Sequence, residues 1–518
     1  MNKRYLLFYS LLIIGFLILV GRLVQLTIIE GAVNRGSADN QRLRLRKISA
    51  LRGIIYDRNG NSLVRNTPVF KICSGQPNQC REIDQLKALQ MEAANQDANL
   101  VIDNGRQYLY GQATAHLLGY LSEASETEVR NGTRDAGQKI GRSGMEQQYN
   151  QTLKGTDGGE LVEVNTNGET LRAIGKKEPV AGKDLYLTVD ANLQKVAYQA
   201  LEGKKGAVVA SNPKTGEILA LVSSPSFDSS QIAQGLNDSN LPLFNRAIGG
   251  VYPPGSTFKI IVAAAGLESG TINSQILIND PGIINVNGYH YSNWYFTQYG
   301  KTEGLINITT ALKRSTDTFF YQLGEMTGAP KIIDWAKKFG VGNYTGIDLD
   351  GETTGFMPDP QTGTWFLGNT YHLSIGQGAL GLTPLQVNQM TSVIASGGKL
   401  CKPTLISDNQ NTRQSDCQNI GIKPETIKII TEGMKEACST GGTAFPLFGF
   451  QPEVACKTGT AEYGDPQGKT HAWLTAFAPA DKPEIAVTVL VEGGGGGGEG
   501  SAVAAPIAKK VLEEYFRK

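Results

Sequence analysis

The sequence predicts an α+β protein: an N-terminal transmembrane helix, a small mixed domain, and a larger domain with an antiparallel sheet flanked by helices. An apolar stretch at residues 5–29 is long enough to span a bilayer. A hairpin pattern at residues 206–222 precedes several helical patterns, and three further strand patterns come after residue 454. A hairpin, then helices, then late strands are typical of an antiparallel sheet with helices packed on it.

The N-terminal apolar stretch has the features of an uncleaved signal anchor. Lys3 and Arg4 precede it, and no small-residue cleavage pattern follows. The alternative is a buried core helix. Basic residues after the span would place the rest of the chain in the cytoplasm by a plain charge count: Arg35, Arg42, Arg44, Arg46 and Lys47. We expect a single pass through the cytoplasmic membrane with the bulk of the chain on the outer, extracellular or periplasmic, side, because the preceding tail has only four residues.

Composition excludes several classes of function. The net charge of +1 gives no electrostatic basis for nucleic-acid binding. The six cysteines form no Cys-x-x-Cys pair and the four histidines are scattered, so we expect no metal site and no cofactor. If the domain lies outside the cell, Cys73 with Cys80 and Cys401 with Cys417 are candidate disulfide pairs, although the connectivity stays open.

We expect four segments: a cytoplasmic tail at 1–4, the anchor at 5–29, a non-catalytic domain at 30–180 and the main domain at 181–518. Residues 30–180 mix short helices and turns and contain no obvious catalytic cluster. In the main domain, the pattern predicts strands at 184–189, 206–210, 217–222, 455–461, 472–478 and 485–491, and helices at 191–201, 307–323, 332–339, 384–395 and 504–516.

The main domain is organised around the stretch from Tyr252 to Leu267. Two prolines and Gly255 interrupt any preceding structure, and the residues after them are apolar on every face of a helix, which is typical of a buried helix. Ser256 and Lys259 lie three residues apart in its first turn and share a face. Burial favours the neutral lysine amine. A serine hydroxyl beside such an amine can act as a nucleophile, and the N–H groups of a helix start suit an oxyanion.

The Ser-x-x-Lys pattern is weak by itself because it occurs three times. The other two copies lie in turns, where we expect neither side chain to be buried: Ser211 with Lys214, and Ser396 with Lys399. Only the copy at Ser256 has a proline–glycine stop before it and a buried helix after it.

Two further polar motifs fit acyl transfer. Ser315 and Asp317 interrupt an otherwise apolar helical pattern, where polar side chains should line a cleft or bond to each other. A strand beginning at Lys457 offers a cation, two hydroxyls and a close-approach glycine, which suit a substrate carboxylate and an oxyanion: Lys457, Thr458, Gly459 and Thr460.

Similar patterns elsewhere in the chain are assigned to structure. Ser407-Asp-Asn409 lies in a polar stretch and Lys214-Thr-Gly216 in a hairpin turn. Gly493–Gly498 follows a strand but lacks the lysine of a phosphate loop, so we expect a flexible hairpin loop.

The three motifs follow one another in the order found in the penicillin-binding protein and serine β-lactamase superfamily. Further segments resemble class B penicillin-binding proteins: Arg52–Gly60, Gly141–Glu146, Asn245–Ala247, Ile375–Gly378, Thr383–Gln386 and His471–Trp473. The resemblance covers most of the chain after its anchor. It implies a membrane-anchored D,D-transpeptidase that cross-links peptidoglycan stem peptides, with a non-catalytic pedestal or dimerisation domain and no glycosyltransferase domain.

The resemblance also implies roles for the candidate residues. Ser256 would be the nucleophile, Lys259 the base, and Ser315 and Asp317 their catalytic partners, while residues 457–460 would bind substrate and oxyanion. It implies stem peptides and β-lactam antibiotics as ligands, lipid around the anchor, and a membrane glycosyltransferase as a candidate partner. Two alternatives stay open: a D,D-carboxypeptidase or β-lactamase-like hydrolase, and a non-catalytic scaffold or β-lactam sensor in wall synthesis.

The sequence departs from the family at Asp317, where asparagine is usual. Asparagine both donates and accepts hydrogen bonds, whereas an ionised aspartate only accepts. We expect two nearby lysines to keep Asp317 ionised and Asp317 to contact Lys259. Because residues two apart do not share a helix face, Ser315 and Asp317 converge only if Ser315 lies at a helix start or in a loop.

Overall fold

A computed structural model describes residues 3–73, 80–94, 100–135, 137–165, 170–407, 415–495 and 500–517. The chain forms two compact units that are not contiguous in sequence. The first comprises Met1–Gly53, Asn66–Arg106 and Gln151–Lys183, and the second comprises Ile54–Arg65, Gln107–Asn150 and Asp184–Lys518. The second unit therefore includes two segments from the region 30–180, for which we expected a single separate domain.

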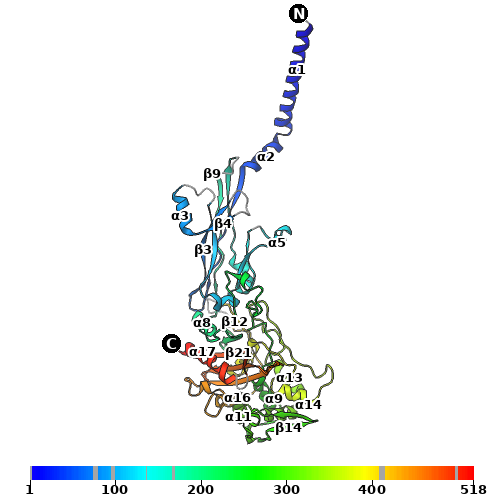
Figure 1. Cartoon of the computed structure of the whole chain (residues 1–518), viewed down its shortest axis with the longest axis vertical. Helices are drawn as coiled ribbons and strands as arrows, with labels where there is room; N and C mark the ends of the chain where they lie inside the picture. The colour runs from blue at the N-terminus through cyan, green and yellow to red at the C-terminus, as the bar shows by residue number, and fades with distance from the viewer. Residues whose placement is uncertain are drawn as a thin grey trace. The chain divides into compact units, whose positions relative to one another are not determined.

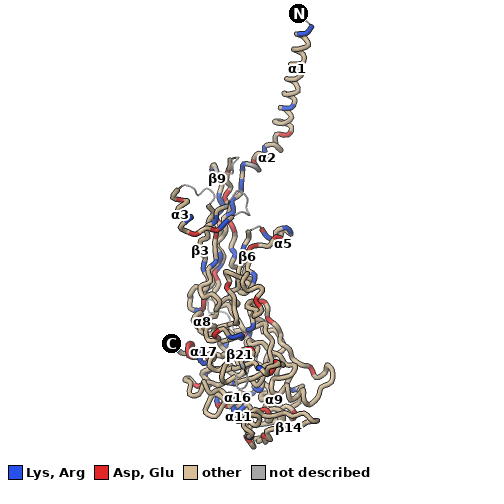
Figure 2. Tube along the Cα trace, viewed as in Figure 1, with Lys and Arg blue, Asp and Glu red and all other residues tan. Residues whose placement is uncertain are grey.

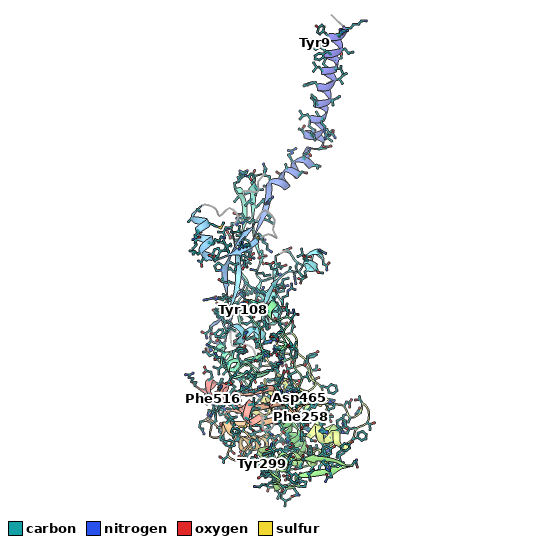
Figure 3. The ribbon with its side chains drawn as sticks, in the orientation of Figure 1. Tyr9, Tyr108, Phe258, Tyr299, Asp465 and Phe516 are labelled. Atoms are coloured by element: carbon teal, nitrogen blue, oxygen red, sulfur yellow. A yellow bond between two sulfur atoms is a disulfide. The ribbon has the colours of Figure 1, made fainter. Side chains whose placement is uncertain are left out.

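The apolar N-terminal stretch forms helix α1 (Lys3–Val24), a π-helical turn (Gln25–Ile29) and then α2 (Gly31–Arg42). Lys3–Ile29 is long and apolar enough to cross a membrane, and α1 has no buried residue. Figure 2 shows little charge along α1, and Figure 3 shows the side chains of this helix, Tyr9 among them. An apolar helix whose residues are all exposed is suited to lipid, so the alternative of a buried core helix is wrong.

Paired strands are the main regular elements of the first unit after α2. β8 (Gly158–Val164) lies between β1 (Leu43–Ile48) and β9 (Thr170–Lys177). β3 (Ser62–Cys73) pairs with β4 (Cys80–Ile83) and β5 (Leu100–Tyr108), and α3 (Gln85–Ala93) is capped by Asp84. None of the candidate site residues lies in this unit.

A five-stranded antiparallel sheet forms the centre of the second unit, in the order β12-β11-β21-β20-β19. Its strands are β11 (Gly206–Ser211), β12 (Ile218–Ser224), β19 (Ala455–Glu462), β20 (Thr470–Ala478) and β21 (Ile485–Gly495). The predicted early hairpin and late strands thus belong to one sheet, joined where β11 pairs with β21. The fold class is confirmed, and β19, which carries Lys457, is an edge strand.

Side chains alternate between the two faces of this sheet. On one face Leu474 and Val489 pack with α8 (Ala191–Ala200) and α17 (Ala505–Phe516), which Figure 1 shows beside β12 and β21. On the other face Trp473 and Leu490 join a larger core, to which seven helices contribute: α9 (Lys259–Glu268), α11 (Ile308–Arg314), α12 (Asp317–Thr327), α13 (Ala329–Lys338), α14 (Leu367–Ser374), α15 (Pro384–Ala395) and α16 (Pro424–Ala437).

Short elements complete the second unit. The predicted strand at 184–189 is reduced to β10 (Leu185–Tyr186), which pairs with β2 (Ile55–Tyr56). The others are α4 (Ala115–Leu118), β6 (Leu121–Glu123), α5 (Glu126–Arg130), β7 (Lys139–Gly141), α6 (Gly144–Gln148), β13 (Ile278–Asp280), β14 (Ile283–Val286), β15 (Tyr289–Ser292), α10 (Trp294–Tyr299), β16 (Gly304–Ile306), β17 (Lys399–Cys401) and β18 (Cys417–Asn419). Helix α7 (Asn150–Leu153) lies where the chain passes between the units.

The prediction of one helix at 307–323 is wrong. Ser315 adopts a left-handed conformation with φ of 55°, which ends α11, and α12 begins at Asp317. A left-handed residue cannot continue a right-handed helix. The break supplies the loop position that Ser315 needs if it is to face the same site as Asp317.

Disulfides join Cys401 to Cys417, one of the candidate pairs, and Cys438 to Cys456, which the sequence did not indicate. Cys80 is also disulfide-bonded, and its Cα faces that of Cys73 across β3 and β4. Cys456 directly precedes Lys457, so the second bond ties β19 to the C-terminal end of α16.

Candidate active site

The turn that carries Ser256 is fixed by close backbone packing. Ser256 lies in a 3-10 turn (Gly255–Phe258) that leads directly into α9 at Lys259. Gly255 has φ of +54°, and a Cβ there would lie 2.8 Å from the carbonyl oxygen of Thr460, so only glycine fits without a shift. Ser256 is half-buried, whereas Lys259 is fully buried, as predicted for a helix that is apolar all round.

Lys259 makes its hydrogen bonds with the middle motif. Its Nζ donates to the Ser315 carbonyl oxygen at 2.8 Å, to Ser315 Oγ at 3.2 Å and to Asp317 Oδ1 at 2.6 Å. The predicted contact between Asp317 and Lys259 is therefore present, and the left-handed Ser315 makes it possible. An ammonium has three donors, so these three acceptors satisfy it fully.

Lys457 reaches the same serine from the sheet. Its Nζ donates to Ser315 Oγ at 2.8 Å and to the Thr458 carbonyl oxygen at 3.0 Å. Ser315 Oγ therefore lies within hydrogen-bonding distance of two lysine Nζ atoms, both belonging to fully buried residues. The structure thus brings together Lys259, Ser315, Asp317 and Lys457, which are far apart in sequence.

The remaining residues of the Lys457 motif form a wall beside the Ser256 turn. A Cβ at Gly459 would lie 3.1 Å from the Pro254 carbonyl oxygen, so the strand and the turn are in close contact. Thr458 is buried and donates to Thr443 Oγ1 at 2.8 Å, whereas Thr460 is exposed. The exposed edge at Thr460 is the part of the motif that a ligand can reach.

Burial and charge both act on the two lysines. Burial lowers the pKa of Lys259, and the Asp317 carboxylate opposes that shift. Burial lowers the pKa of Lys457 well below its usual range, the neighbouring Lys259 lowers it further, and Asp317 opposes both effects. Two lysines share one carboxylate, so the site favours a neutral amine on one of them.

Ser256 Oγ has no hydrogen-bond partner among the described residues. The donors of Lys259 point to the middle motif instead. To take a proton from Ser256, Lys259 must be neutral and present its lone pair. Hydrogen bonds of catalytic groups are often long in unliganded enzymes and tighten when substrate binds.

Residues that the sequence did not indicate hold Asp317 in place. Asn293 Oδ1 accepts from the Asp317 N–H at 3.2 Å, and its amide donates to Asp280 Oδ2 at 3.0 Å. Asp280 also accepts from Thr318 Oγ1 at 2.5 Å. Asp280 and Asn293 lie in a segment without regular periodicity, so only the folded chain reveals this support.

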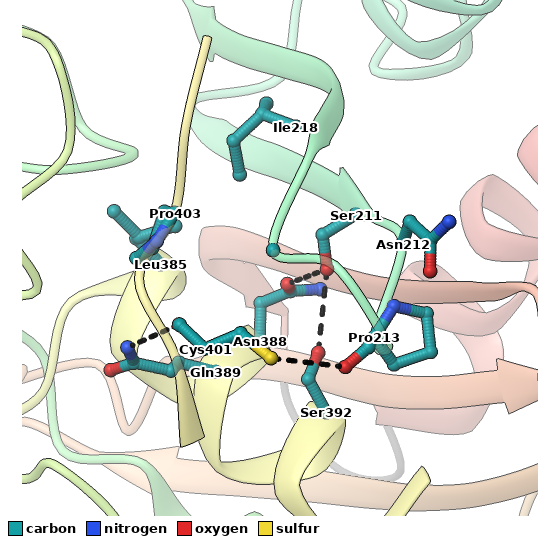
Figure 4. Close-up of a pocket in the computed structure, with 11 residues that line it drawn as sticks. Ser211, Asn212, Pro213, Ile218, Leu385, Asn388, Gln389, Ser392, Cys401 and Pro403 are labelled. Atoms are coloured by element: carbon teal, nitrogen blue, oxygen red, sulfur yellow. Dashed lines mark hydrogen bonds between the residues drawn. The ribbon is translucent and has the colours of Figure 1, made fainter. Parts of the chain in front are cut away.

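The duplicate motifs lie elsewhere or outside the described residues. We expected Ser211 to be exposed, but it is buried and bonds to Asn388 Oδ1 at 2.6 Å and Ser392 Oγ at 3.3 Å, as Figure 4 shows. The cause is its position on β11 against α15. Its partner in the pattern, Lys214, is exposed as expected. Residues 408 and 409 of the Ser407 motif, and residues 496–498 of the glycine run, lie outside the described part of the chain. Within that part, no group of three or more His, Cys, Asp or Glu residues could hold a metal ion.

Comparisons with known proteins agree with this arrangement. Residues 206–513 match the penicillin binding protein transpeptidase domain, and residues 85–187 match the penicillin-binding protein dimerisation domain. Peptidoglycan D,D-transpeptidase MrdA of Acinetobacter baumannii is 33% identical over 584 aligned residues, which cover 96% of this chain and 86% of MrdA.

Solved structures give the same result. PBP2 of Helicobacter pylori, in a complex with MreC, has a TM-score of 0.78 and 27% identity over 92% of this chain and 99% of its own. A chain of a peptidoglycan synthase complex that coordinates polymerization and crosslinking has a TM-score of 0.79 and 28% identity, over 99% and 98% of the two chains. The chain therefore belongs to the class B penicillin-binding proteins, with a dimerisation domain and a transpeptidase domain.

Proposed function

We propose that the protein is a peptidoglycan D,D-transpeptidase with Ser256 as its nucleophile. Ser256 Oγ attacks the carbonyl carbon of the penultimate D-alanine of one stem peptide, and the terminal D-alanine leaves after its nitrogen takes up a proton. The amine of a second stem peptide then attacks the acyl-enzyme, loses a proton and releases Ser256. The relatives named peptidoglycan D,D-transpeptidase support this reaction.

One observation carries the proposal: Ser315 Oγ lies between the Nζ atoms of Lys259 and Lys457, at 3.2 and 2.8 Å. Acyl transfer by serine needs a base for the nucleophile and a proton donor for the leaving amine. A neutral Lys259 accepts the proton of Ser256. The Ser315 hydroxyl, bonded to both lysines, passes a proton to the departing nitrogen.

The edge strand β19 forms the opposite wall. We assign one oxyanion donor to the Thr460 N–H and one to the Ser256 N–H, because the packing of Gly255 on Thr460 brings these segments together. The exposed Thr460 hydroxyl binds the terminal carboxylate of the substrate. Lys457 is fully buried and bonds to Ser315 Oγ, so it acts on that carboxylate across the Ser315 hydroxyl. The negative charge of the bound substrate then favours the protonated amine against the effect of burial.

Asp317 predicts a shift in the pH dependence of acylation. Its carboxylate opposes the lowering of the Lys259 pKa by burial. Asp317→Asn removes that charge, so the pKa of Lys259 should fall further and its amine should become neutral at lower pH. We expect the rising limb of acylation rate against pH to move to lower pH in the variant, measured with a fluorescent penicillin. Superimposable profiles would show that Asp317 does not control Lys259.

The reaction is tested with purified full-length protein, a donor stem peptide ending in D-Ala-D-Ala and an acceptor peptide with a free amine. We expect a cross-linked product that increases with acceptor concentration and is absent in Ser256→Ala. If the donor peptide loses D-alanine but no cross-linked product forms, water is the acceptor and the protein is a carboxypeptidase. If the stem peptide gives neither product nor acyl-enzyme, the protein is a non-catalytic scaffold, or a β-lactam sensor if a β-lactam still acylates it.

The anchor and the disulfides support a location outside the cytoplasm. The long apolar α1 is consistent with a membrane-anchored protein, and we propose that residues 30–518 lie on the outer side, with 30–180 as pedestal and 181–518 as transpeptidase domain. Two disulfides lie in the second unit, and such bonds persist in oxidising compartments. The synthase complex among the solved relatives supports a membrane glycosyltransferase as partner.

This topology predicts sensitivity to external protease. The basic residues after the span favour the opposite side, so the experiment discriminates between two orientations. Protease added to intact spheroplasts should digest most of the chain, with a cytoplasmic protein as the protected control. Full protection of the chain until lysis would contradict the proposed side.

A further inference from the structure

Tyr252, four residues before Ser256, is held by a partly buried ion pair, Arg246 with Glu492, that the reaction does not use. Its hydroxyl donates to Glu492 Oε1 at 2.6 Å. The same oxygen accepts from Arg246 Nε at 2.8 Å. Burial and the Glu492 carboxylate raise the pKa of Tyr252, so the hydroxyl keeps its proton and remains a donor.

Arg246 is itself immobilised, so Glu492 has a fixed position. The Arg246 side chain is 4% exposed, and its other nitrogens donate to the carbonyl oxygens of Leu241 at 3.1 Å and Asn240 at 2.9 Å. Glu492 lies near the end of β21, which pairs directly with β20 in the central sheet. The pair therefore connects Tyr252 to β21 through Glu492 and to the 240–246 segment through Arg246.

The chain from Tyr252 to Ser256 is held at nearly every residue. The Tyr252 backbone exchanges two hydrogen bonds with Leu382, at 2.9 and 2.8 Å. Trp473 Nε1 donates to the Pro253 carbonyl oxygen at 2.9 Å, and the Gly255 N–H donates to the Gly376 carbonyl oxygen at 2.9 Å. The Tyr252 ring lies edge-on to His471 and Trp473, with centroids 5.3 and 6.3 Å away.

We propose that Tyr252 and Glu492 are positioning residues that orient Ser256 for acylation. This inference rests on the proposed role of Ser256 as nucleophile. The Tyr252–Glu492 bond fixes the start of a segment whose end, Gly255, packs against the Thr460 carbonyl. A tilt of Tyr252 would therefore move Ser256 relative to both Lys259 and Thr460. Arg246 holds Glu492 and Trp473 holds Pro253, so these two residues, from segments that the sequence singled out without a function, support the same turn.

The test measures the acylation rate constant and the dissociation constant of the initial complex separately, from the concentration dependence of β-lactam acylation of the full-length protein. Tyr252→Phe removes one hydroxyl and keeps the ring. We expect it to lower the acylation rate constant about tenfold, because small misplacements of a reacting group are costly, and to leave the dissociation constant unchanged. Tyr463→Phe is the matched control, because Tyr463 stacks on His471 but its hydroxyl bonds to Asp465.

Glu492 provides a second, conservative variant. Glu492→Gln keeps an oxygen that can accept from Tyr252, so it should retain more of the acylation rate than Glu492→Ala. In the Tyr252→Phe background, Glu492→Gln should cause little further loss, since the two residues act through one bond. Thermal unfolding of every variant shows whether it is folded.

Each outcome decides the inference. A wild-type rate constant in Tyr252→Phe would overturn it. A variant that loses acylation rate, affinity for the β-lactam in the initial complex and melting temperature together would also overturn it, because this pattern indicates a merely structural role. If the wild-type protein forms no adduct on Ser256, the proposed function fails and the inference falls with it. If the wild-type protein forms the adduct on Ser256 and Tyr252→Phe acylates at the wild-type rate, the inference is refuted and the proposed function stands.

Discussion

Replacement of Lys259 by alanine is expected to lower the rate of Ser256 acylation by about 10²–10⁴-fold, the usual contribution of a general base. Lys259 is fully buried and is the partner of Asp317 at 2.6 Å, so the variant also leaves that carboxylate without its ion pair. The rate is measured as covalent labelling by a fluorescent penicillin against time. Thermal unfolding of the same samples separates lost chemistry from lost folding.

Lys259→Arg is the decisive control for this prediction. Arginine keeps the positive charge beside Asp317 but is not deprotonated in proteins, so it cannot act as a base. If Lys259 is the base, Lys259→Arg should be nearly as inactive as Lys259→Ala. An active Lys259→Arg protein would show that the lysine serves only as a counter-ion, and another group would have to activate Ser256.

Replacement of Lys457 by alanine should also cause a large loss. Its Nζ bonds Ser315 Oγ at 2.8 Å, and its charge acts on the substrate carboxylate at the edge of β19. A hydrogen bond to a charged group contributes about 1.5–3 kcal/mol, which corresponds to a loss of about 10- to 150-fold in acylation efficiency.

The matched control for Lys457 is Lys469→Ala, which removes an exposed lysine from the connection between β19 and β20. We expect this control to acylate at the wild-type rate. A Lys457→Ala protein with the same rate as its control would move the carboxylate site away from β19.

The helix behind Ser256 could be predicted from the sequence because the signal is local. Apolar residues cover every face after the proline–glycine stop, and in the structure every residue of α9 except its last is buried. The strands around Lys457 were predictable for the same reason, since each is a short run of mainly apolar or β-branched residues. Their order in the sheet follows from the folded chain, where β11 pairs with β21 across most of the sequence.

The conformation of Ser315 could not be predicted, because it contradicts the local pattern. Residues 307–323 favour one continuous helix, and a left-handed serine is unfavourable by itself. Hydrogen bonds from Lys259 and Lys457 surround Ser315 in the folded protein and stabilise this conformation. Backbone strain of this kind is commonly found where a functional site over-determines the chain.

Disulfide and hydrogen-bond partners that are far apart in the chain could not be predicted from the sequence either. The disulfide between Cys438 and Cys456 joins the end of α16 to β19, and spacing alone does not indicate it. Asn293 accepts a hydrogen bond from the Asp317 N–H although it lies 24 positions upstream, in a segment without periodicity. Ser211 was misassigned because its exposure depends on α15, which packs against β11.

The identity of the acylated residue tests the role of Ser256 most directly. Full-length protein is treated with a β-lactam, digested and analysed by mass spectrometry, beside Ser256→Ala treated in the same way. We expect one adduct, on the peptide that contains Ser256, and no adduct in the variant. An adduct on another serine, or equal labelling of the Ser256→Ala protein, would contradict the assignment of Ser256 as the nucleophile.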